Sequence, residues 1–157
     1  MRELAAYQAR FATPFAVLGV QTGGECVTDI EYLPRGSPTL APLDALAERT
    51  CRQLERWLDD PHYRFDLPYE LSGTDFQARV WRAIATIPVG ATRTYGELAK
   101  LLRTAPRAVG AACGANRLPI LIPCHRVLGA TGLGGFMQAT AGFPLDIKRW
   151  LLAHETR

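Results

Sequence analysis

The chain has 157 residues, of which 48% are hydrophobic and 21% are charged, and its formal net charge is +3 at pH 7. This length and composition predict a soluble globular protein of one or two small domains. No apolar run is long enough to span a bilayer, and no signal peptide is recognisable, so a membrane protein and a secreted protein are excluded. We expect a cytoplasmic protein with no membrane partner.

The four cysteines do not form the pairs typical of small metal or redox domains. Cys26, Cys51, Cys113 and Cys124 include no Cys-x-x-Cys spacing, which argues against a zinc ribbon or a thioredoxin-like site. In a reducing cytoplasm all four are expected to remain thiols, and disulfides are the less favoured interpretation. We predict no metal site.

The charge changes sign along the chain. Residues 1–72 contain seven basic and eleven acidic residues, a net charge of −4, whereas residues 73–157 contain eleven basic and four acidic residues, a net charge of +7. A concentrated positive half is typical of a protein that binds a polyanion such as DNA. A solvated basic surface that pairs with the acidic half explains the same numbers, so charge alone leaves both interpretations open.

The first half predicts a small α/β domain over residues 1–72. Residues 15–20 and 26–32 are strand-like, and Gly23-Gly24 between them indicates a hairpin turn. Apolar residues then recur at helical spacing over residues 43–58, with Pro42 in the first helical turn. Two shorter segments follow, a predicted strand and a linker: residues 63–67 and 68–73. This half contains no recognisable catalytic set, and His62 is expected to be solvated.

The second half, residues 73–157, is predicted to be mostly helical. Thr74 can cap a first helix that ends before Pro88, and a second short helix covers residues 95–102. Thr104 is a candidate cap for a third helix that starts at Pro106. Two short helices joined by a tight turn are the outline of a helix-turn-helix. The small residues of the third helix would allow close approach to DNA or to another helix, and periodicity does not decide between them.

Residues 118–123 form an apolar run that leads directly to Cys124, His125 and Arg126. The run predicts a buried strand or a rigid turn whose end fixes the cysteine in space. A neighbouring imidazole and guanidinium both favour a thiolate, so the composition predicts a lowered pKa for Cys124 and a role as nucleophile. The alternative is an inert buried cysteine beside two solvated basic residues.

Several motifs in the second half, taken together and in order, resemble the O6-alkylguanine-DNA alkyltransferases, also called methylated-DNA:protein-cysteine methyltransferases. They are Arg-Ala-Val-Gly at 107–110, Asn116, Pro-Cys-His-Arg-Val at 123–127, Gly-Gly-Phe at 134–136 and Trp-Leu-Leu-Ala-His-Glu at 150–155. The resemblance is dense from Gly73 to Glu155 and weak before it. It implies an α+β protein, in which a ribonuclease-H-like α/β unit precedes a helical, winged-helix-like domain with a helix-turn-helix.

The resemblance also implies the chemistry. In this family the cysteine that matches Cys124 attacks the alkyl carbon of O6-alkylguanine in DNA, and O4-alkylthymine is a second expected substrate. The residue that matches His125 acts as a water-mediated base and is oriented by the glutamate that matches Glu155. The thioether product has no leaving route, so each molecule acts once. No cofactor is implied.

Further roles in binding DNA follow from the same resemblance. The helix-turn-helix enters the minor groove of double-stranded DNA and extrudes the damaged base, with Arg107 taking its place in the stack. Tyr95 is expected to rotate the base and hydrogen-bond its ring, and Asn116 to brace the turn before the cysteine. The backbone of Cys124 and Val127 would accept the guanine amino group. The other two candidate binding residues are Met137, whose amide would donate to O6, and Arg126.

Three features depart from the family pattern. The segment between Tyr95 and Arg107 is two residues shorter than expected, so the placement of the arginine depends on a shortened turn. Met-Gln-Ala at 137–139 replaces paired glycines and would narrow the pocket. Cys113 lies in the predicted third helix at a position where an apolar residue is expected. It is either a small side chain that packs against its neighbours or a second reactive thiol.

Two other functions remain open from the sequence. A protein that binds alkylated DNA without transfer would share the fold but would carry tryptophan in place of Cys124. A helix-turn-helix regulator would need an exposed apolar helix for dimerisation, and none is recognisable. We therefore expect a monomer.

Overall fold

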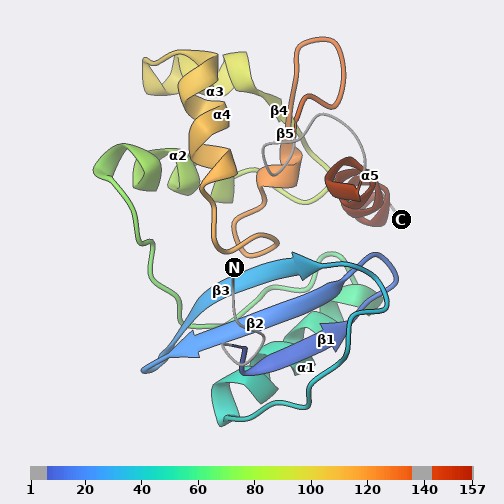
Figure 1. Cartoon of the computed structure of the whole chain (residues 1–157). Coiled ribbons are helices and arrows are strands. Elements are labelled where there is room, and N and C mark those ends of the chain that lie inside the picture. The colour runs from blue at the N-terminus through green and yellow to red at the C-terminus, as the bar shows by residue number, and fades with distance from the viewer. Residues whose placement is uncertain (1–6, 136–142, 157) are drawn as a thin grey trace. The chain divides into compact units, whose positions relative to one another are not determined.

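A computed structural model describes residues 7–135 and 143–156 (Figure 1). The chain forms two compact units, residues 1–70 and residues 71–157. Sheet and helices both contribute, as the sequence predicts. Within the described ranges, no helix combines the length and the apolar character needed to cross a bilayer.

A three-stranded antiparallel sheet forms the centre of the first unit. Its strands are β1 (Ala9–Ala12), β2 (Val17–Gly23) and β3 (Cys26–Leu33), in the order β1-β2-β3. The β2–β3 hairpin is confirmed, although its turn lies at Gly24-Glu25 and not at Gly23-Gly24. Gly24 has a φ of +63°, which glycine adopts without strain. β1 was not predicted from the sequence.

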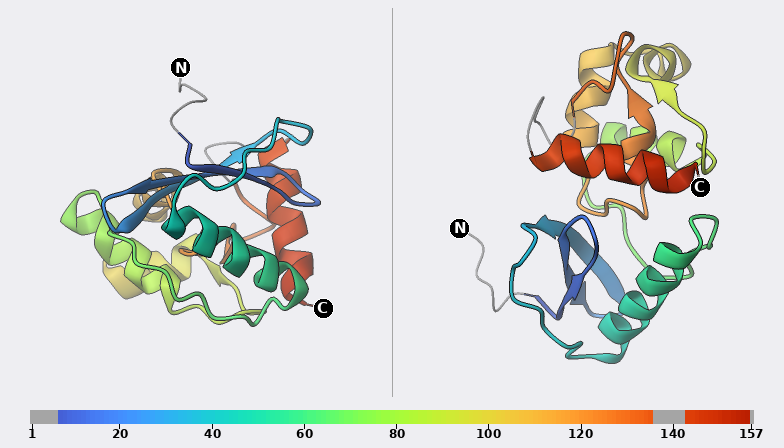
Figure 2. Two further views of the ribbon diagram at one scale, coloured as in Figure 1. Left: turned by 90° about the horizontal axis from the view of Figure 1, so that it is seen from below. Right: turned by 90° about the vertical axis from the view of Figure 1, so that its right-hand side faces the viewer.

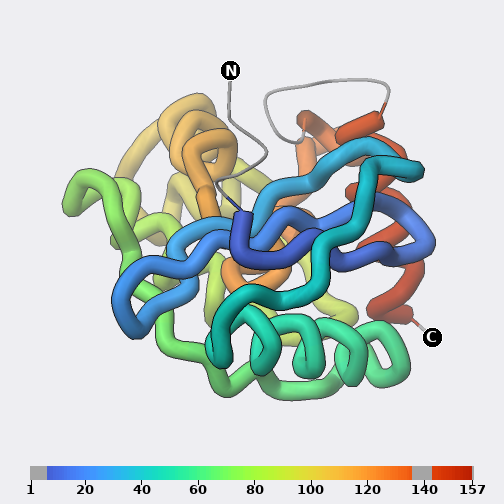
Figure 3. The backbone as a smooth tube through the Cα atoms, turned by 60° about the horizontal axis from the view of Figure 1, so that its bottom comes forward, coloured from blue at the N-terminus to red at the C-terminus, as the bar shows by residue number. Residues whose placement is uncertain are grey.

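Helix α1 (Ala45–Asp59) packs against all three strands and covers one face of the sheet (Figure 2). The predicted helix is confirmed, but Pro42 precedes it, because Asp44 is the N-cap and its side chain accepts a hydrogen bond from the Ala47 amide. Leu54 and Trp57 are buried on its inner face. Figure 3 follows the chain from β3 through the intervening loop into this helix.

The strand predicted over residues 63–67 is wrong. The segment is extended, but its backbone pairs with a side chain: the Gln53 amide accepts from the Asp66 amide at 2.8 Å and donates to the Asp66 carbonyl at 3.0 Å. The only ladder-like contact nearby within the described chain is an isolated bridge between Val27 and Tyr69. The alternating pattern therefore reported an extended, half-buried chain and not a strand in a sheet.

The second unit is mostly helical, as predicted. Its elements are α2 (Asp75–Ala85), β4 (Arg93–Thr94), α3 (Tyr95–Leu102), α4 (Pro106–Gly114), the short 3₁₀ helix η2 (Cys124–Arg126), β5 (Val127–Leu128) and α5 (Phe143–Glu155). Capping boxes start α2 at Thr74 with Gln77, and α3 at Thr94 with Glu97. β4 and β5 pair in parallel.

Helices α3 and α4 pack together and are joined by a three-residue turn, which is the predicted helix-turn-helix outline. Pro106 is the first residue of α4, but Thr104 is not its cap: Ala105 occupies the N-cap position and makes no side-chain cap bond. The Trp81 indole donates to the Ala112 carbonyl at 2.8 Å and ties α2 to α4. Helix packing therefore accounts for at least part of the small-residue surface of α4.

Replacing Asp44 by alanine should lower the free energy of unfolding by about 1 kcal/mol, because α1 loses its N-cap and Asp44 no longer accepts from the Thr22 hydroxyl on β2 at 2.6 Å. Thermal and urea unfolding of the full chain measure the change. Asp59→Ala, at the exposed opposite end of the same helix, is the matched control. Equal stability of Asp44→Ala and Asp59→Ala would contradict the capping role.

Candidate active site

A tight turn, and not a strand, leads to Cys124. Leu118, Ile120 and Ile122 bury their side chains beneath this turn. Ile120 adopts a φ of +76°, a conformation in which a β-branched residue is strained. Cys124 then begins η2, is only 4% exposed, and donates its amide to the Ile122 carbonyl at 2.8 Å. Because the apolar side chains of this run are buried, the run fixes the position of the Cys124 thiol.

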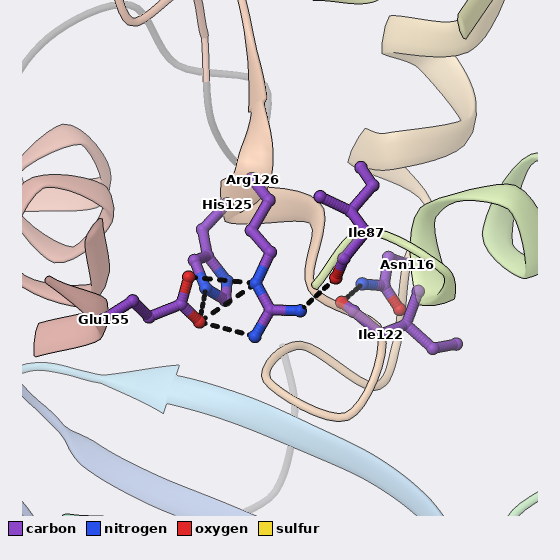
Figure 4. A network of polar contacts seen from close by, with 6 residues as sticks. All are labelled: Ile87, Asn116, Ile122, His125, Arg126 and Glu155. Atoms are coloured by element: carbon purple, nitrogen blue, oxygen red, sulfur yellow. Dashed lines mark hydrogen bonds and ion pairs between the residues drawn. The ribbon is translucent and has the colours of Figure 1, made fainter. Parts of the chain in front are cut away.

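Asn116 braces this turn from within the second unit. Its side-chain amide donates to the Ile122 carbonyl at 2.9 Å (Figure 4). The same amide donates to the Cys124 sulfur at 3.2 Å. Its carbonyl oxygen accepts from the Leu118 amide at 2.9 Å. Asn116 therefore holds the two ends of the turn, as expected for this residue. Its side-chain amide also contacts the Cys124 thiol, a contact that the sequence does not indicate.

The predicted lowering of the Cys124 pKa is wrong. A hydrogen bond with the Cys113 side chain and burial raise the pKa of Cys124 well above its usual value, and the Asn116 amide and the Lys148 charge only partly oppose them. The local composition misled because His125 and Arg126 both turn toward Glu155. In the structure the sulfur is therefore held as a neutral thiol at neutral pH.

His125, Arg126 and Glu155 form a buried polar cluster between η2 and the end of α5 (Figure 4). The His125 Nε2 lies 2.9 Å from the Glu155 Oε2. The Arg126 guanidinium donates to the same carboxylate through Nε at 2.9 Å and Nη2 at 2.6 Å. His125 and Glu155 are 2% and 4% exposed, so these contacts operate with little solvent screening.

The protonation states of this cluster follow from its partners. Burial opposes ionisation of Glu155, but hydrogen bonds from His125 and Arg126 outweigh it and lower the pKa of Glu155 to about 2. Burial lowers the pKa of His125 more than Glu155 raises it, so the ring is neutral at pH 7. Because an ionised carboxylate has no proton to donate, Nε2 must donate to Glu155, and Nδ1 is left as the acceptor.

Arg126 is largely committed to the protein itself. Besides Glu155, it donates from Nη1 to the Ile87 carbonyl at 2.6 Å, just after α2. Its side chain is 11% exposed. A direct contact of Arg126 with a ligand stays a prediction, whereas its anchoring of Glu155 is observed.

Tyr95 contacts the glycine-rich loop that follows β5. The Tyr95 hydroxyl donates to the Gly135 carbonyl at 3.1 Å, and burial raises the pKa of this tyrosine. Gly134 has a φ of +70°, and a Cβ there would lie 2.9 Å from the Gly129 nitrogen and 3.0 Å from the Tyr95 ring. Only glycine fits this position. Met137 lies outside the described residues.

Lys148 is a functional residue that the sequence reasoning missed. It is fully buried on α5, and its ammonium donates to the carbonyls of Val127 at 2.7 Å, Leu133 at 2.7 Å and Gly135 at 2.9 Å. An ammonium has three donors, and here each has a carbonyl acceptor. Burial lowers the pKa of Lys148 to about 8, so the group remains mostly charged at neutral pH.

A signal for Lys148 was present in the sequence. Leu145 and Leu151, three residues before and after it, are buried on the same face of α5. A lysine at the centre of an apolar helical face is rarely solvated, since its neighbours face the core. Such a position indicates a buried charge with specific acceptors.

Arg107 lies in the first turn of α4 and is exposed. Lys100 on α3 and Arg103 in the turn are exposed as well, so basic side chains accompany both helices of the helix-turn-helix outline. Arg103 has a φ of +56°, in the left-handed region, and is the C-cap that ends α3. Within residues 7–135 and 143–156, no three histidine, cysteine or acidic side chains gather as a metal site would require.

Comparisons with known sequences place this site in context. The family described as 6-O-methylguanine DNA methyltransferase, DNA binding domain, matches residues 75–157. A methylated-DNA–protein-cysteine methyltransferase of Methanosarcina acetivorans is 46% identical over 95% of this chain and 97% of its own length. One from Mycolicibacterium paratuberculosis is 51% identical over 59% of this chain and 55% of its own. Several of the matched relatives are thus covered over only about half to three fifths of their length.

Solved structures show the same similarity. The crystal structure of Mycobacterium tuberculosis OGT in complex with DNA has a TM-score of 0.76 at 37% identity, covering 93% of this chain and 90% of that one. An O6-methylguanine DNA methyltransferase from Methanococcus jannaschii has a TM-score of 0.66 at 27% identity, covering 93% and 92%. The likeness therefore includes both units of the chain.

Lys148→Met should lower the free energy of unfolding by about 2–4 kcal/mol, because three carbonyls lose a buried donor that an apolar side chain of similar length cannot replace. Chemical denaturation measures the loss. Arg149→Met is the matched control, since the neighbouring Arg149 is exposed and forms an ion pair with the exposed Asp146. A loss for Lys148→Met no larger than for Arg149→Met would contradict the role assigned to the buried ammonium.

Proposed function

Because the chain belongs to the methylated-DNA–protein-cysteine methyltransferases, we propose that it repairs O6-alkylguanine in DNA by moving the alkyl group irreversibly onto its own Cys124. One observation carries the proposal: a buried thiol, braced by Asn116, begins the same short helix in which His125 is bound by Glu155. A nucleophile, a base and a residue that orients the base are thereby brought into one small region.

The reaction is a substitution at the alkyl carbon. The Cys124 sulfur forms a bond to that carbon as the bond to the guanine O6 breaks, the thiol proton is lost, and the guanine gains a proton in leaving. The product is a thioether, which has no further leaving group. Each protein molecule therefore acts once, and the reaction calls for no cofactor.

His125 would take up the thiol proton. Since the Cys124 pKa is raised, little thiolate exists in advance, and a base is required during the reaction. The neutral ring has its acceptor Nδ1 available, and we assign the contact with the thiol to a bridging water. Glu155 keeps the ring in this tautomer. Its carboxylate also binds Arg126, so it is a positioning residue and does not take up the proton.

The substrate pocket would be formed by backbone groups and Tyr95. The carbonyls of Cys124 and Val127 are assigned to the guanine amino group. The Val127 oxygen already accepts from Lys148, but a carbonyl has a second lone pair for this purpose. Tyr95 is assigned to base rotation and to the ring nitrogen, and the amide of Met137 to O6.

DNA would be bound by the helix-turn-helix of α3 and α4 in the minor groove of the duplex, by one protein molecule at a time. The DNA complex of the Mycobacterium tuberculosis relative supports DNA as the partner. Exposed Arg107 at the start of α4 is assigned to the space left by the extruded base, while Lys100 and Arg103 provide positive charge for phosphates. Contacts of this kind predict little sequence preference.

We extend the same proposal to the finer description of the chain. Residues 1–72 would be a ribonuclease-H-like domain, and residues 73–157 a winged-helix-like domain that binds DNA and accepts the alkyl group. O4-alkylthymine would be a second substrate. The protein would work in the cytoplasm, on the nucleoid. A DNA-binding protein without transfer, or a transcription regulator, is not favoured. Neither function needs a cysteine bound by Asn116 next to a histidine bound by Glu155.

An oligonucleotide duplex that contains O6-methylguanine should transfer one methyl group to each protein molecule and then stop, because the thioether does not turn over. After tryptic digestion, mass spectrometry should find the methyl group on the peptide of residues 118–126, which contains Cys124. Cys124→Ala should bind the duplex without transfer, and Cys51→Ala should transfer normally. Methylation at another cysteine, or repeated turnover, would contradict the mechanism.

The transfer rate at saturating DNA should be constant at neutral pH and fall as His125 becomes protonated. Because the pKa of His125 is lowered, the midpoint of this fall should lie below 6.5, the usual histidine value. Single-turnover rates from pH 5 to 9 test this. A rate that rises tenfold per pH unit throughout the range would instead indicate that the thiol must first lose its proton to solvent.

Substitution of His125 by alanine should slow the transfer step on the order of 10²-fold, the usual contribution of a general base. Duplex affinity and the melting temperature are measured in parallel, so that a folding defect is recognised. His62→Ala, at an exposed histidine outside the site, is the control. If the two variants transfer methyl groups equally fast, His125 is not the base.

A further inference from the structure

A second thiol lies against the proposed nucleophile. Cys113, in the last turn of α4, is half-buried, and its side chain is a neighbour of the buried Cys124 thiol. Asn116 contacts both residues: its backbone amide donates to the Cys113 carbonyl at 3.1 Å, and its side chain donates to the Cys124 sulfur at 3.2 Å. The proposed alkyl transfer uses only one of these two sulfurs.

The surroundings of the two sulfurs are shared. The buried ammonium of Lys148 interacts electrostatically with both Cys113 and Cys124. Their exposure differs, however. Cys113 is partly accessible to solvent, whereas Cys124 is 4% exposed. A small reagent that arrives from solvent therefore reaches Cys113 first.

We propose that Cys113 and Cys124 form a reversible disulfide when the protein meets a hydroperoxide, so that the nucleophile is stored in a form that a reductant can restore. The inference rests on the proposed function only in naming Cys124 as the alkyl acceptor.

The chemistry balances with the hydroperoxide as the oxidant. In the first step the Cys113 sulfur attacks the peroxide, the O–O bond breaks, and a sulfenic acid and one molecule of water or alcohol result. In the second step the Cys124 sulfur attacks the Cys113 sulfur, the S–S bond forms, and the S–O bond breaks. The departing hydroxide takes the Cys124 proton as water. Two thiols are oxidised and one peroxide is reduced.

A disulfide requires the two sulfurs to approach to about 2.05 Å. Residues 115–123 between them contain turns and an isolated bridge, and no helix or strand has to be broken. Cys113 lies one residue before the end of α4, where helix ends fray most easily. Cys26 and Cys51 belong to the first unit, and burial raises the pKa of Cys51 to about 11, which disfavours its oxidation.

The experiment treats the full chain with hydrogen peroxide, blocks remaining thiols with an alkylating reagent, and digests the protein with trypsin without reduction. Cleavage after Arg107, Arg117 and Arg126 separates the two thiols into the peptides 108–117 and 118–126. We expect these two peptides to be joined by one disulfide within a monomer, with Cys26 and Cys51 blocked as free thiols. Reduction should release the two peptides.

Methyl transfer is measured on the same samples before peroxide, after peroxide and after reduction. In the unmodified protein, transfer should fall in proportion to the linked fraction and return on reduction. In Cys113→Ala, peroxide should lower transfer more slowly, because the buried Cys124 then has no exposed partner thiol through which it is oxidised, and Cys51→Ala should behave like the unmodified protein. Each variant is compared with its own untreated rate.

The proposal is overturned if peroxide leaves peptides 108–117 and 118–126 unlinked, if the link joins two protein molecules, or if peroxide lowers transfer by Cys113→Ala as fast as by the unmodified protein. The link is detected by mass without DNA, so this result is independent of alkyl transfer. A linked protein whose untreated form transfers no methyl group would contradict the proposed function alone.

Discussion

The geometry of the site depends on one buried carboxylate. Glu155, near the C-terminal end of α5, accepts hydrogen bonds from His125 and Arg126 on η2, and Arg126 in turn binds the Ile87 carbonyl after α2. Three segments distant in sequence therefore meet at a single charge. A buried charge is costly unless it is paired, so removing any one of these side chains would leave a buried charge without its partner and lower the stability of the fold. This mutual dependence fixes η2, and with it the position of Cys124.

Helix α5 holds the site at two points of opposite charge. Lys148 and Glu155 are seven residues apart, two helical turns, and so lie on the same face, with buried Leu151 between them. Lys148 binds the carbonyls of the chain that follows η2, and Glu155 binds the side chains of η2 itself. The apolar packing of α5 thus presents a donor and an acceptor to one continuous segment, and that segment satisfies both of them.

Local signals predicted the helices well and the irregular segments poorly. Thr74 with its glutamine three residues later is a local capping pattern, so the sequence predicts α2 together with its start. Thr104 failed as a cap because the neighbouring Ala105 takes the N-cap position and Pro106 starts α4 there. The strand predicted over residues 63–67 is wrong because an alternating pattern indicates which side chains are buried, but not which group hydrogen-bonds the backbone. Here that group is a glutamine side chain. Hydrogen bonds made over long separations leave no mark in a short window of sequence.

The site residues could be named from their motifs, but their electrostatics could not. Adjacent basic residues suggested an ionised sulfur, yet Glu155 attracts both His125 and Arg126, and the sulfur of Cys124 is left with a thiol and an amide as neighbours. A neutral thiol is the less reactive form, so spontaneous reaction with other alkylating agents is suppressed until a base and a bound substrate act together. Because the proposed reaction uses the nucleophile only once, the buried surroundings of the sulfur and their hydrogen bonds are as important to it as the sulfur itself.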